Sequence, residues 1–367
     1  MQVIDRSWLE PLLSGGTFLG SGGGGEAGNS TFLLKEIQAN IQAIHLMGLE
    51  ELDPEGFYAG VGMIGSPELM EEHFPTSLKG IDALERLKVL TGREFRGLMT
   101  VECATVNILY PLLVACRAQL PLIDADAMGR AFPEIQMTAF NFAGLPSTPM
   151  AVIDGRGHSY DFTEEDNFLM ELNRRRIVGE GGGIGFFAGF PYRGGVLKRV
   201  LIPGTISFAY DLGRVFMNPG TYLNMLDNLI RVTRNSIYGS AIELFTGSVV
   251  EKERMENLGW RAITIRGSGS YAGEEFKILT QNESLIAYRQ NRVAAMVPDL
   301  ISIIDMKTLR PVYNSDLFPG MEVAVIGTPA PLQLKTRKNL DVVGPRYFGC
   351  KSGYEPLEKL YYFYYYK

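Results

Sequence analysis

The sequence predicts an α/β protein with an N-terminal three-layer αβα domain, whose sheet is mainly parallel, and a C-terminal, mainly antiparallel, β-barrel-like domain. Up to about residue 165, helical and short apolar segments alternate, which is typical of a parallel sheet covered on both faces. From about residue 240, short β-branched segments separated by Gly and Asn turns are typical of an antiparallel barrel or sandwich. With 367 residues, of which 46% are hydrophobic, the chain can fill two cores. We expect domains at 1–165 and 166–355, followed by an aromatic tail at 356–367.

The first domain is expected to place polar residues at the ends of its strands. Apolar residues at helical spacing predict helices, and short continuous apolar runs predict buried strands. Ligands of parallel sheets bind at the carboxyl ends of the strands, so the residues that follow each strand are candidates for a site. The expected helices are 6–13, 29–41, 80–91 and 106–119, and the expected strands are 57–64, 97–101 and 122–126.

The second half contains a glycine cluster at 179–185 before its helices and strands. Together with the glycines near the N-terminus, this cluster indicates tight backbone packing at a domain junction, or simply flexible loops. The tail 360–367 carries six consecutive aromatic residues, which either contact another subunit or fray. We predict a homo-oligomer. The expected helices are 206–215 and 222–231, and the expected strands are 242–251, 260–267, 275–280, 284–290, 292–297, 300–305 and 322–327.

Composition excludes several classes of protein. The net charge of −6 argues against a nucleic-acid partner, and the one basic run, 173–176, is expected to be a solvated helix face. The sequence has no apolar run of 18 residues, and its N-terminus lacks the basic-then-apolar order of a signal peptide. We therefore expect a cytoplasmic protein with no membrane partner. The chain has three cysteines, which are not closely spaced, and three histidines. These are too few for a Cys- or His-based metal site, so we expect carboxylates to bind any divalent metal.

Four consecutive glycines, Gly22, Gly23, Gly24 and Gly25, precede the expected helix at 29–41. Bare backbone at a helix N-terminus can bind a ligand through its N–H groups, although such a segment also serves chain reversal alone. The pattern matches neither the dinucleotide fingerprint nor a Walker loop, which disfavours a nucleotide.

The densest group of chemical side chains lies between residues 124 and 137. In an extended segment Asp124 and Asp126 share one face, so with Arg130, Glu134 and Gln136 they could activate water or bind a divalent metal. In the alternative interpretation, Asp124 or Asp126 caps the following turn and Arg130 pairs with Glu134. If a metal is bound, Asp124 and Asp126 are its expected ligands.

Two further strand ends carry candidate residues. Glu102 follows the strand at 97–101, and Asn107 or Thr105 is expected to cap the next helix. Cys103 is a weak candidate nucleophile, because a neighbouring carboxylate raises a thiol pKa.

Met63, Gly65 and Ser66 lie at the end of the strand at 57–64 or just after it. Pro67 is typical of a first helical turn, so we interpret Ser66 as a helix cap rather than a nucleophile.

Three N-terminal segments together resemble the S-methyl thiohydantoin desulfurase-like family. They are 18–25 (FLGSGGGG), 61–67 (VGMIGSP) and 124–138 (DADAMGRAFPEIQMT), and similar segments of the second half are 281–283 (QNE), 297–301 (VPDLI) and 343–349 (VGPRYFG). The resemblance implies an αβα domain followed by a β-barrel-like domain. It also implies hydrolytic removal of sulfur from a hydantoin-type ring and an association with hydantoinase and oxoprolinase systems.

The chain departs from the family pattern at two places in the expected pocket. Where relatives commonly have Glu followed by two glycines and then Asn, this chain has ECATVN at 102–107. Where relatives have an acidic residue and Pro after the glycines, it has Glu26 and Ala27.

The leading hypothesis is a hydrolase that acts on a small, polar, five-membered heterocycle. Asp124 or Asp126 would be the base or metal ligand, with Glu102 nearby. The N–H groups of residues 22–25 would bind a ring carbonyl or a carboxylate, and Arg130 would clamp a carboxylate. The remaining substrate-binding candidates are Met63, Gly65, Ser66, Asn107, Glu134 and Gln136.

Two alternatives remain open. One is a non-catalytic binding or scaffold subunit for a hydantoinase- or oxoprolinase-type partner. The other is a site for an anion or a nucleotide at the glycine segment.

Overall fold

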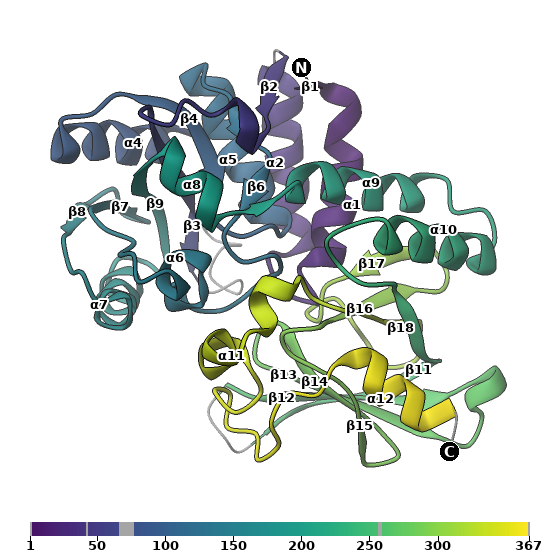
Figure 1. Ribbon diagram of the computed structural model, residues 1–367. Coiled ribbons are helices and arrows are strands. Elements are labelled where there is room, and N and C mark those ends of the chain that lie inside the picture. The colour runs from purple at the N-terminus through teal and green to yellow at the C-terminus, as the bar shows by residue number, and fades with distance from the viewer. Residues whose placement is uncertain (1, 42, 66–76, 256–258, 366–367) are drawn as a thin grey trace. The chain divides into compact units, whose positions relative to one another are not determined.

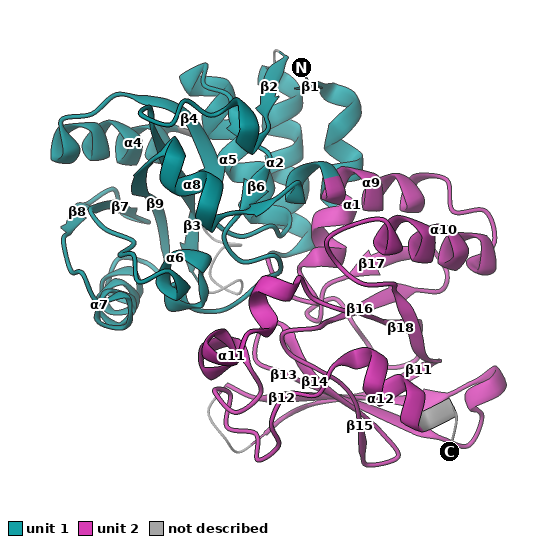
Figure 2. Ribbon diagram, in the orientation of Figure 1, with its two compact units in different colours: residues 1–13, 25–207 teal, residues 14–24, 208–367 magenta. Residues whose placement is uncertain are grey.

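A computed structural model describes residues 2–41, 43–65, 77–255 and 259–365. The chain forms two compact units: Met1–Leu13 with Gly25–Ser207 (unit 1), and Ser14–Gly24 with Phe208–Lys367 (unit 2) (Figure 2). In the described part of the chain, no helix is long and apolar enough to cross a membrane.

Unit 1 is built on an eight-stranded mixed sheet in the order β1-β2-β5-β4-β3-β9-β7-β8. The pairs β2–β5, β5–β4 and β4–β3 are parallel, and the outer pairs are antiparallel. This mainly parallel centre confirms the predicted α/β class. The strands are β1 (Gln2–Ile4), β2 (Ile44–Met47), β3 (Phe57–Gly65), β4 (Phe95–Thr100), β5 (Leu122–Ile123), β7 (Met150–Asp154), β8 (Ser159–Phe162) and β9 (Ile184–Arg193).

Helices lie on both faces of this sheet (Figure 1). Successive side chains of a strand point to opposite faces. Phe186 of β9 packs on Tyr110 of α5, with 5.4 Å between ring centroids, whereas a Cβ on Gly185 would lie 2.9 Å from Val178 of α7. The sheet is therefore the middle layer. The helices of unit 1 are α2 (Ala27–Asn40), α4 (Ser77–Thr91), α5 (Thr105–Ala118), α6 (Ala139–Phe142), α7 (Asn167–Glu180) and α8 (Gly194–Val200), with short 3-10 turns η1 (Leu49–Glu51) and η2 (Ile135–Met137).

The strand expected at 122–126 is interrupted at Asp124. Its first part, β5, belongs to the large sheet, and its second part, β6 (Ala125–Asp126), pairs with β10 (Ile202–Pro203). The chain thus leaves the sheet at the carboxyl end of β5, where the segment 124–138 begins.

Unit 2 is built on an eight-stranded antiparallel sheet in the order β15-β14-β13-β12-β11-β18-β16-β17, which is barrel-like but not closed. This confirms the predicted antiparallel second domain. Phe245, Phe276 and Val325 are fully buried in its core. The strands are β11 (Ile242–Arg254), β12 (Arg261–Gly267), β13 (Glu275–Thr280), β14 (Ser284–Arg289), β15 (Arg292–Met296), β16 (Leu300–Asp305), β17 (Arg310–Val312) and β18 (Glu322–Thr328).

The remaining elements of unit 2 are mostly short. They are α10 (Tyr222–Arg234), α11 (Arg337–Val343), α12 (Leu357–Tyr365), η3 (Gly269–Tyr271) and η4 (Leu332–Lys335). The helix α9 (Thr205–Met217) begins in unit 1 and continues in unit 2.

The first helix is longer than predicted. It was expected to end at residue 13, but α1 (Arg6–Leu19) continues through two glycines. A Cβ on Gly15 would lie 1.7 Å from the carbonyl oxygen of Ala209, so glycine lets α1 approach the backbone of α9. Packing therefore outweighs the low helix propensity of glycine at this position.

Candidate functional site

A chain of hydrogen bonds joins three of the predicted residues at the carboxyl ends of β3 and β4. The backbone N–H of Met63 donates to Oδ1 of Asn107 (3.2 Å), and Nδ2 of Asn107 donates to Oε1 of Glu102 (3.1 Å). The backbone N–H of Phe132 donates to Oε2 of Glu102 (3.1 Å). Glu102 is only 8% exposed, so its carboxylate is held in a fixed orientation at the edge of the sheet.

The helix-capping role predicted for Asn107 or Thr105 is wrong. The N-cap of α5 is Ala104, which has no capping side chain, and Asn107 lies inside the first turn. Because α5 starts directly beside β3, the amide of Asn107 reaches the backbone of Met63 instead.

Asp126 is fully buried and holds a loop through one carboxylate oxygen. Oδ2 accepts hydrogen bonds from the backbone N–H groups of Cys103 (2.8 Å), Met128 (3.2 Å) and Gly129 (2.8 Å). Burial raises the pKa of Asp126 to about 6, although these N–H groups and the nearby Thr205 hydroxyl oppose the shift. Oδ1 makes no hydrogen bond of good geometry with any described residue. The geometry matches the interpretation in which Asp126 caps the turn that follows it.

Asp124 is directed to a different partner. Its Oδ1 accepts the backbone N–H groups of Ile206 (3.0 Å) and Ser207 (2.9 Å), and its Oδ2 accepts the hydroxyl of Ser207 (2.6 Å). Burial raises the pKa of Asp124, and the bonds from Ser207 and Ile206 oppose this. Asp124 therefore supplies the acceptor that the N-terminus of α9 needs.

The predicted metal ligands do not form a metal-binding set. Three of the four carboxylate oxygens of Asp124 and Asp126 already accept hydrogen bonds, mostly from backbone N–H groups. Among the described residues, no group of three or more His, Cys, Asp or Glu side chains could hold a metal ion. We therefore derive no step through a metal.

Cys103 has the surroundings of an unreactive thiol. It is fully buried, and its Sγ donates to the carbonyl of Thr205 (3.3 Å). Burial, and then the carboxylate of Asp126, raise its pKa well above the usual thiol value. This confirms its expected weakness as a nucleophile.

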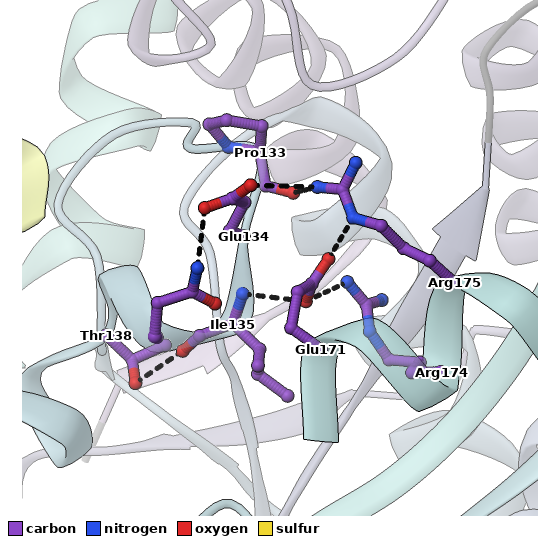
Figure 3. Close-up of polar contacts among 8 residues, drawn as sticks. Pro133, Glu134, Ile135, Thr138, Glu171, Arg174 and Arg175 are labelled. Carbon is purple, nitrogen blue, oxygen red and sulfur yellow. Dashed lines mark hydrogen bonds and ion pairs between the residues drawn. The ribbon is translucent and has the colours of Figure 1, made fainter. Parts of the chain in front are cut away.

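Glu134 belongs to a cluster that ties the segment 124–138 to α7 (Figure 3), and Gln136 is bonded to Glu134. Nε2 of Gln136 donates to Glu134 (2.5 Å), and Glu134 lies 3.7 Å from Nη2 of Arg175. Nη2 of Arg175 also donates to the carbonyl of Pro133 (2.8 Å). The two predicted side chains therefore stabilise the loop.

The centre of this cluster is Glu171 of α7, which is not among the site residues predicted from the sequence. Its buried carboxylate accepts the N–H of Ile135 (3.0 Å) and pairs with Arg174 (2.5 Å) and Arg175 (Figure 3). Burial would raise the pKa of Glu171, but the two guanidinium groups and the N–H of Ile135 hold it below its usual range. Arg174 is only 8% exposed, so the prediction of a solvated face at 173–176 is wrong at this position. The i,i+3 and i,i+4 spacing of these three residues could have indicated the pairing.

Arg130 lies inside unit 1 rather than at its surface. It is fully buried, its Nε donates to the carbonyl of Ala131 (3.1 Å), and its guanidinium lies 5.1 Å from the ring centroid of Phe132. This placement fixes the loop backbone next to Phe132, which donates to Glu102.

The four glycines of 22–25 divide between the two units. In unit 2, a Cβ on Gly22 would lie 2.3 Å from the amide of Asn314, and one on Gly23 would lie 2.6 Å from Oε1 of Glu283. In unit 1, a Cβ on Gly25 would lie 2.7 Å from Cγ2 of Val106. Close packing against protein atoms therefore accounts for glycine at these three positions.

The described part of the chain stops at Gly65, the end of β3, and resumes at residue 77. Gly65 is the last residue of β3, and a Cβ there would lie 2.5 Å from the carbonyl oxygen of Gly183 within the same unit. Ser66, predicted to cap a helix, lies outside the described residues.

The fold and site define a two-part α/β protein with buried carboxylates at the carboxyl edge of its first sheet. The family model described as "S-Me-THD-like, N-terminal domain" matches residues 7–164, and "S-Me-THD-like, C-terminal domain" matches residues 165–357. The chain belongs to this S-Me-THD-like family, which confirms the resemblance seen in the sequence.

Comparison with solved structures shows the same fold in another protein. A crystal structure of a protein from Chromobacterium violaceum has 24% sequence identity and a TM-score of 0.82, and the match covers 97% of this chain and 100% of that one. A search of the curated proteins finds no match.

Proposed function

We propose that this protein is a hydrolase of hydantoin-type five-membered rings that cleaves the carbon–sulfur bond of an S-alkyl thiohydantoin. Membership of the S-Me-THD-like family supports this substrate class. The observation that carries the proposal is the fixed carboxylate of Glu102, which Asn107 and Phe132 orient at the carboxyl ends of β3 and β4. Open α/β sheets bind their ligands at this edge.

In the proposed reaction, Glu102 acts as the general base. It takes a proton from a water molecule, whose oxygen attacks the ring carbon that carries sulfur. The bond from this carbon to sulfur then breaks, and the carbon becomes a ring carbonyl. Of the two water protons, one ends on the ring nitrogen and the other on the departing thiolate, so the products are a hydantoin and a thiol.

The other acidic and nucleophilic candidates fit supporting roles better. Asp124 accepts two backbone N–H groups at the start of α9, and Asp126 accepts three, so both carboxylates hold the backbone around them. The pKa of the Cys103 thiol is raised well above its usual value. Asp126 also holds the N–H of Cys103, the residue directly after Glu102, so it is a positioning residue in this scheme.

The test is release of methanethiol from an S-methyl thiohydantoin, followed with a thiol-reactive dye. Removing a general base typically lowers the rate by about 10²–10⁴-fold, which is the loss expected for Glu102→Gln. Glu85→Gln changes a carboxylate on the surface of α4, whose side chain is 60% exposed, and should leave the rate unchanged. Thermal unfolding of both variants checks that they are folded.

Two results would count against the proposal. Wild-type turnover in a folded Glu102→Gln variant would remove Glu102 from the mechanism. Absence of thiol release by the wild-type protein would favour the alternative, a non-catalytic subunit for a hydantoinase- or oxoprolinase-type partner.

A further inference from the structure

Asn29 is a buried amide without hydrogen-bond partners among the residues that the structure describes. Its side chain is on α2 and is 1% exposed, yet neither Oδ1 nor Nδ2 has a partner among the described residues. Buried polar groups in proteins are nearly always paired, because an unpaired one keeps its desolvation penalty. We therefore expect a ligand to supply the hydrogen bonds that the Asn29 amide lacks.

The amide lies at the open end of a long helix. Asn29 is the third residue of the 14-residue helix α2, and the side chain of the N-cap residue, Glu26, makes no capping hydrogen bond. Helical side chains tilt toward the N-terminus, so the amide lies over the first turn, where backbone N–H groups lack helical partners. Ala27 and Gly28 are exposed, and a Cβ on Gly28 would meet no atom within 4 Å. Solvent thus borders the first turn at Ala27 and Gly28.

This helix end lies beside the Glu102 network within unit 1. α2 packs against α5, and the Cβ position of Gly25 is 2.7 Å from Cγ2 of Val106 in the first turn of α5. The same turn carries Asn107, which bonds to Glu102. The N-termini of the two helices are therefore neighbours.

We propose that Asn29 binds the cyclic amide edge of the substrate. A ring amide presents an N–H donor and a C=O acceptor side by side, which matches the adjacent Oδ1 and Nδ2 of asparagine. A carboxylate or phosphate presents only acceptors and would leave Oδ1 unpaired. This inference rests on the proposed function and specifies which edge of the ring the protein recognises.

The test measures binding rather than turnover. Titration calorimetry on the full chain compares hydantoin with 1,3-dimethylhydantoin, which has no N–H donor. We expect the wild-type protein to bind hydantoin at least tenfold more tightly than the dimethyl compound, and Asn29→Leu to lose that preference. The melting temperature of the ligand-free Asn29→Leu protein should rise, because the unpaired amide is replaced by an apolar side chain of similar size.

Asn40→Leu is the matched control. Asn40 ends the same helix, and its Nδ2 donates to the carbonyl of Glu36 (2.6 Å), so its replacement should leave the hydantoin preference intact. Equal affinity of the wild-type protein for the two compounds would overturn the inference. So would unchanged hydantoin binding by Asn29→Leu, or a lower melting temperature of that variant without ligand.

The outcomes separate this inference from the hydrolase proposal. Hydantoin binding that depends on Asn29, without any thiol release, would leave the inference standing and refute the hydrolase. Thiol release by Asn29→Leu with an unchanged KM would overturn the inference and leave the hydrolase standing.

Discussion

Replacing Asp126 by Asn removes a buried titrating group with little change in shape. The asparagine oxygen can still accept the N–H groups of Cys103 and Gly129. Its amide nitrogen then takes the place of Oδ1, near the Thr205 hydroxyl, whose oxygen can accept a hydrogen bond from it. The main change is that position 126 no longer gains or loses a proton.

The size of the effect follows from the raised pKa. Burial raises the pKa of Asp126 from 3.8 to about 6, so the folded state binds the proton more tightly than the unfolded state. The stabilisation is fully present below the unfolded pKa and is lost as the pH rises through the folded pKa. Between pH 5 and pH 7.5, the wild-type protein should therefore lose about 1.4 kcal/mol of unfolding free energy relative to Asp126→Asn.

Urea unfolding can follow unit 1 separately. Trp8 is buried in unit 1 and the other tryptophan, Trp260, is in unit 2, so a Trp260→Phe background leaves a fluorescent reporter of unit 1. At each pH, the unfolding free energy of the wild-type protein is subtracted from that of Asp126→Asn. The contributions of all other titrating groups cancel in this difference. Asp166→Asn is the control for loss of a carboxylate, because asparagine is an equally good N-cap for α7. The reasoning would be refuted if the difference in unfolding free energy between the two proteins stayed constant between pH 5 and pH 7.5. It would also be refuted if the wild-type protein gained stability relative to Asp126→Asn at high pH.

Three further predictions concern stability. Glu171→Gln leaves the guanidinium of Arg174 buried without its anion, which should cost about 3–5 kcal/mol near neutral pH by urea unfolding. That loss should shrink as the pH falls through the lowered pKa of Glu171, and a cost that does not change with pH would contradict the ion-pair account. Gly15→Ala forces a Cβ against the carbonyl of Ala209 and should destabilise unit 2 by more than about 2 kcal/mol. Gly179→Ala on α7 meets no atom within 4 Å and should stabilise the protein by about 0.5–1 kcal/mol.

Local signals were sufficient for most of the fold. The short apolar run at 57–64, with glycine on either side, and the alternating segments after residue 240 are typical of strands. The end of α1 could not be found in this way, because Gly15 normally weakens a helix and is helical here only through its contact with Ala209. The exposed face predicted at 173–176 failed for a similar reason. The spacing of Glu171 and Arg174 indicates that they can pair, but not that the pair is buried where α7 packs on the loop.

The candidate site shows the same limit. The order of strands and helices indicated that Glu102, Asn107 and Met63 would lie near one sheet edge, and the structure joins them in one hydrogen-bond chain. Their roles depended on geometry. Asp124 and Asp126 lie two residues apart, yet one bonds to the start of α9 and the other to the loop after β4, because the strand breaks between them.

By itself, the sequence determined the family, the αβα and antiparallel units, and the edge of the sheet where polar residues collect, because these follow from short-range periodicity and residue order. Only the tertiary structure decided which carboxylates accept backbone N–H groups, and that the buried amide of Asn29 has no partner among the described residues. Hydrogen bonds between residues 20 to 100 positions apart depend on how strands and helices pack, and no local pattern encodes that packing.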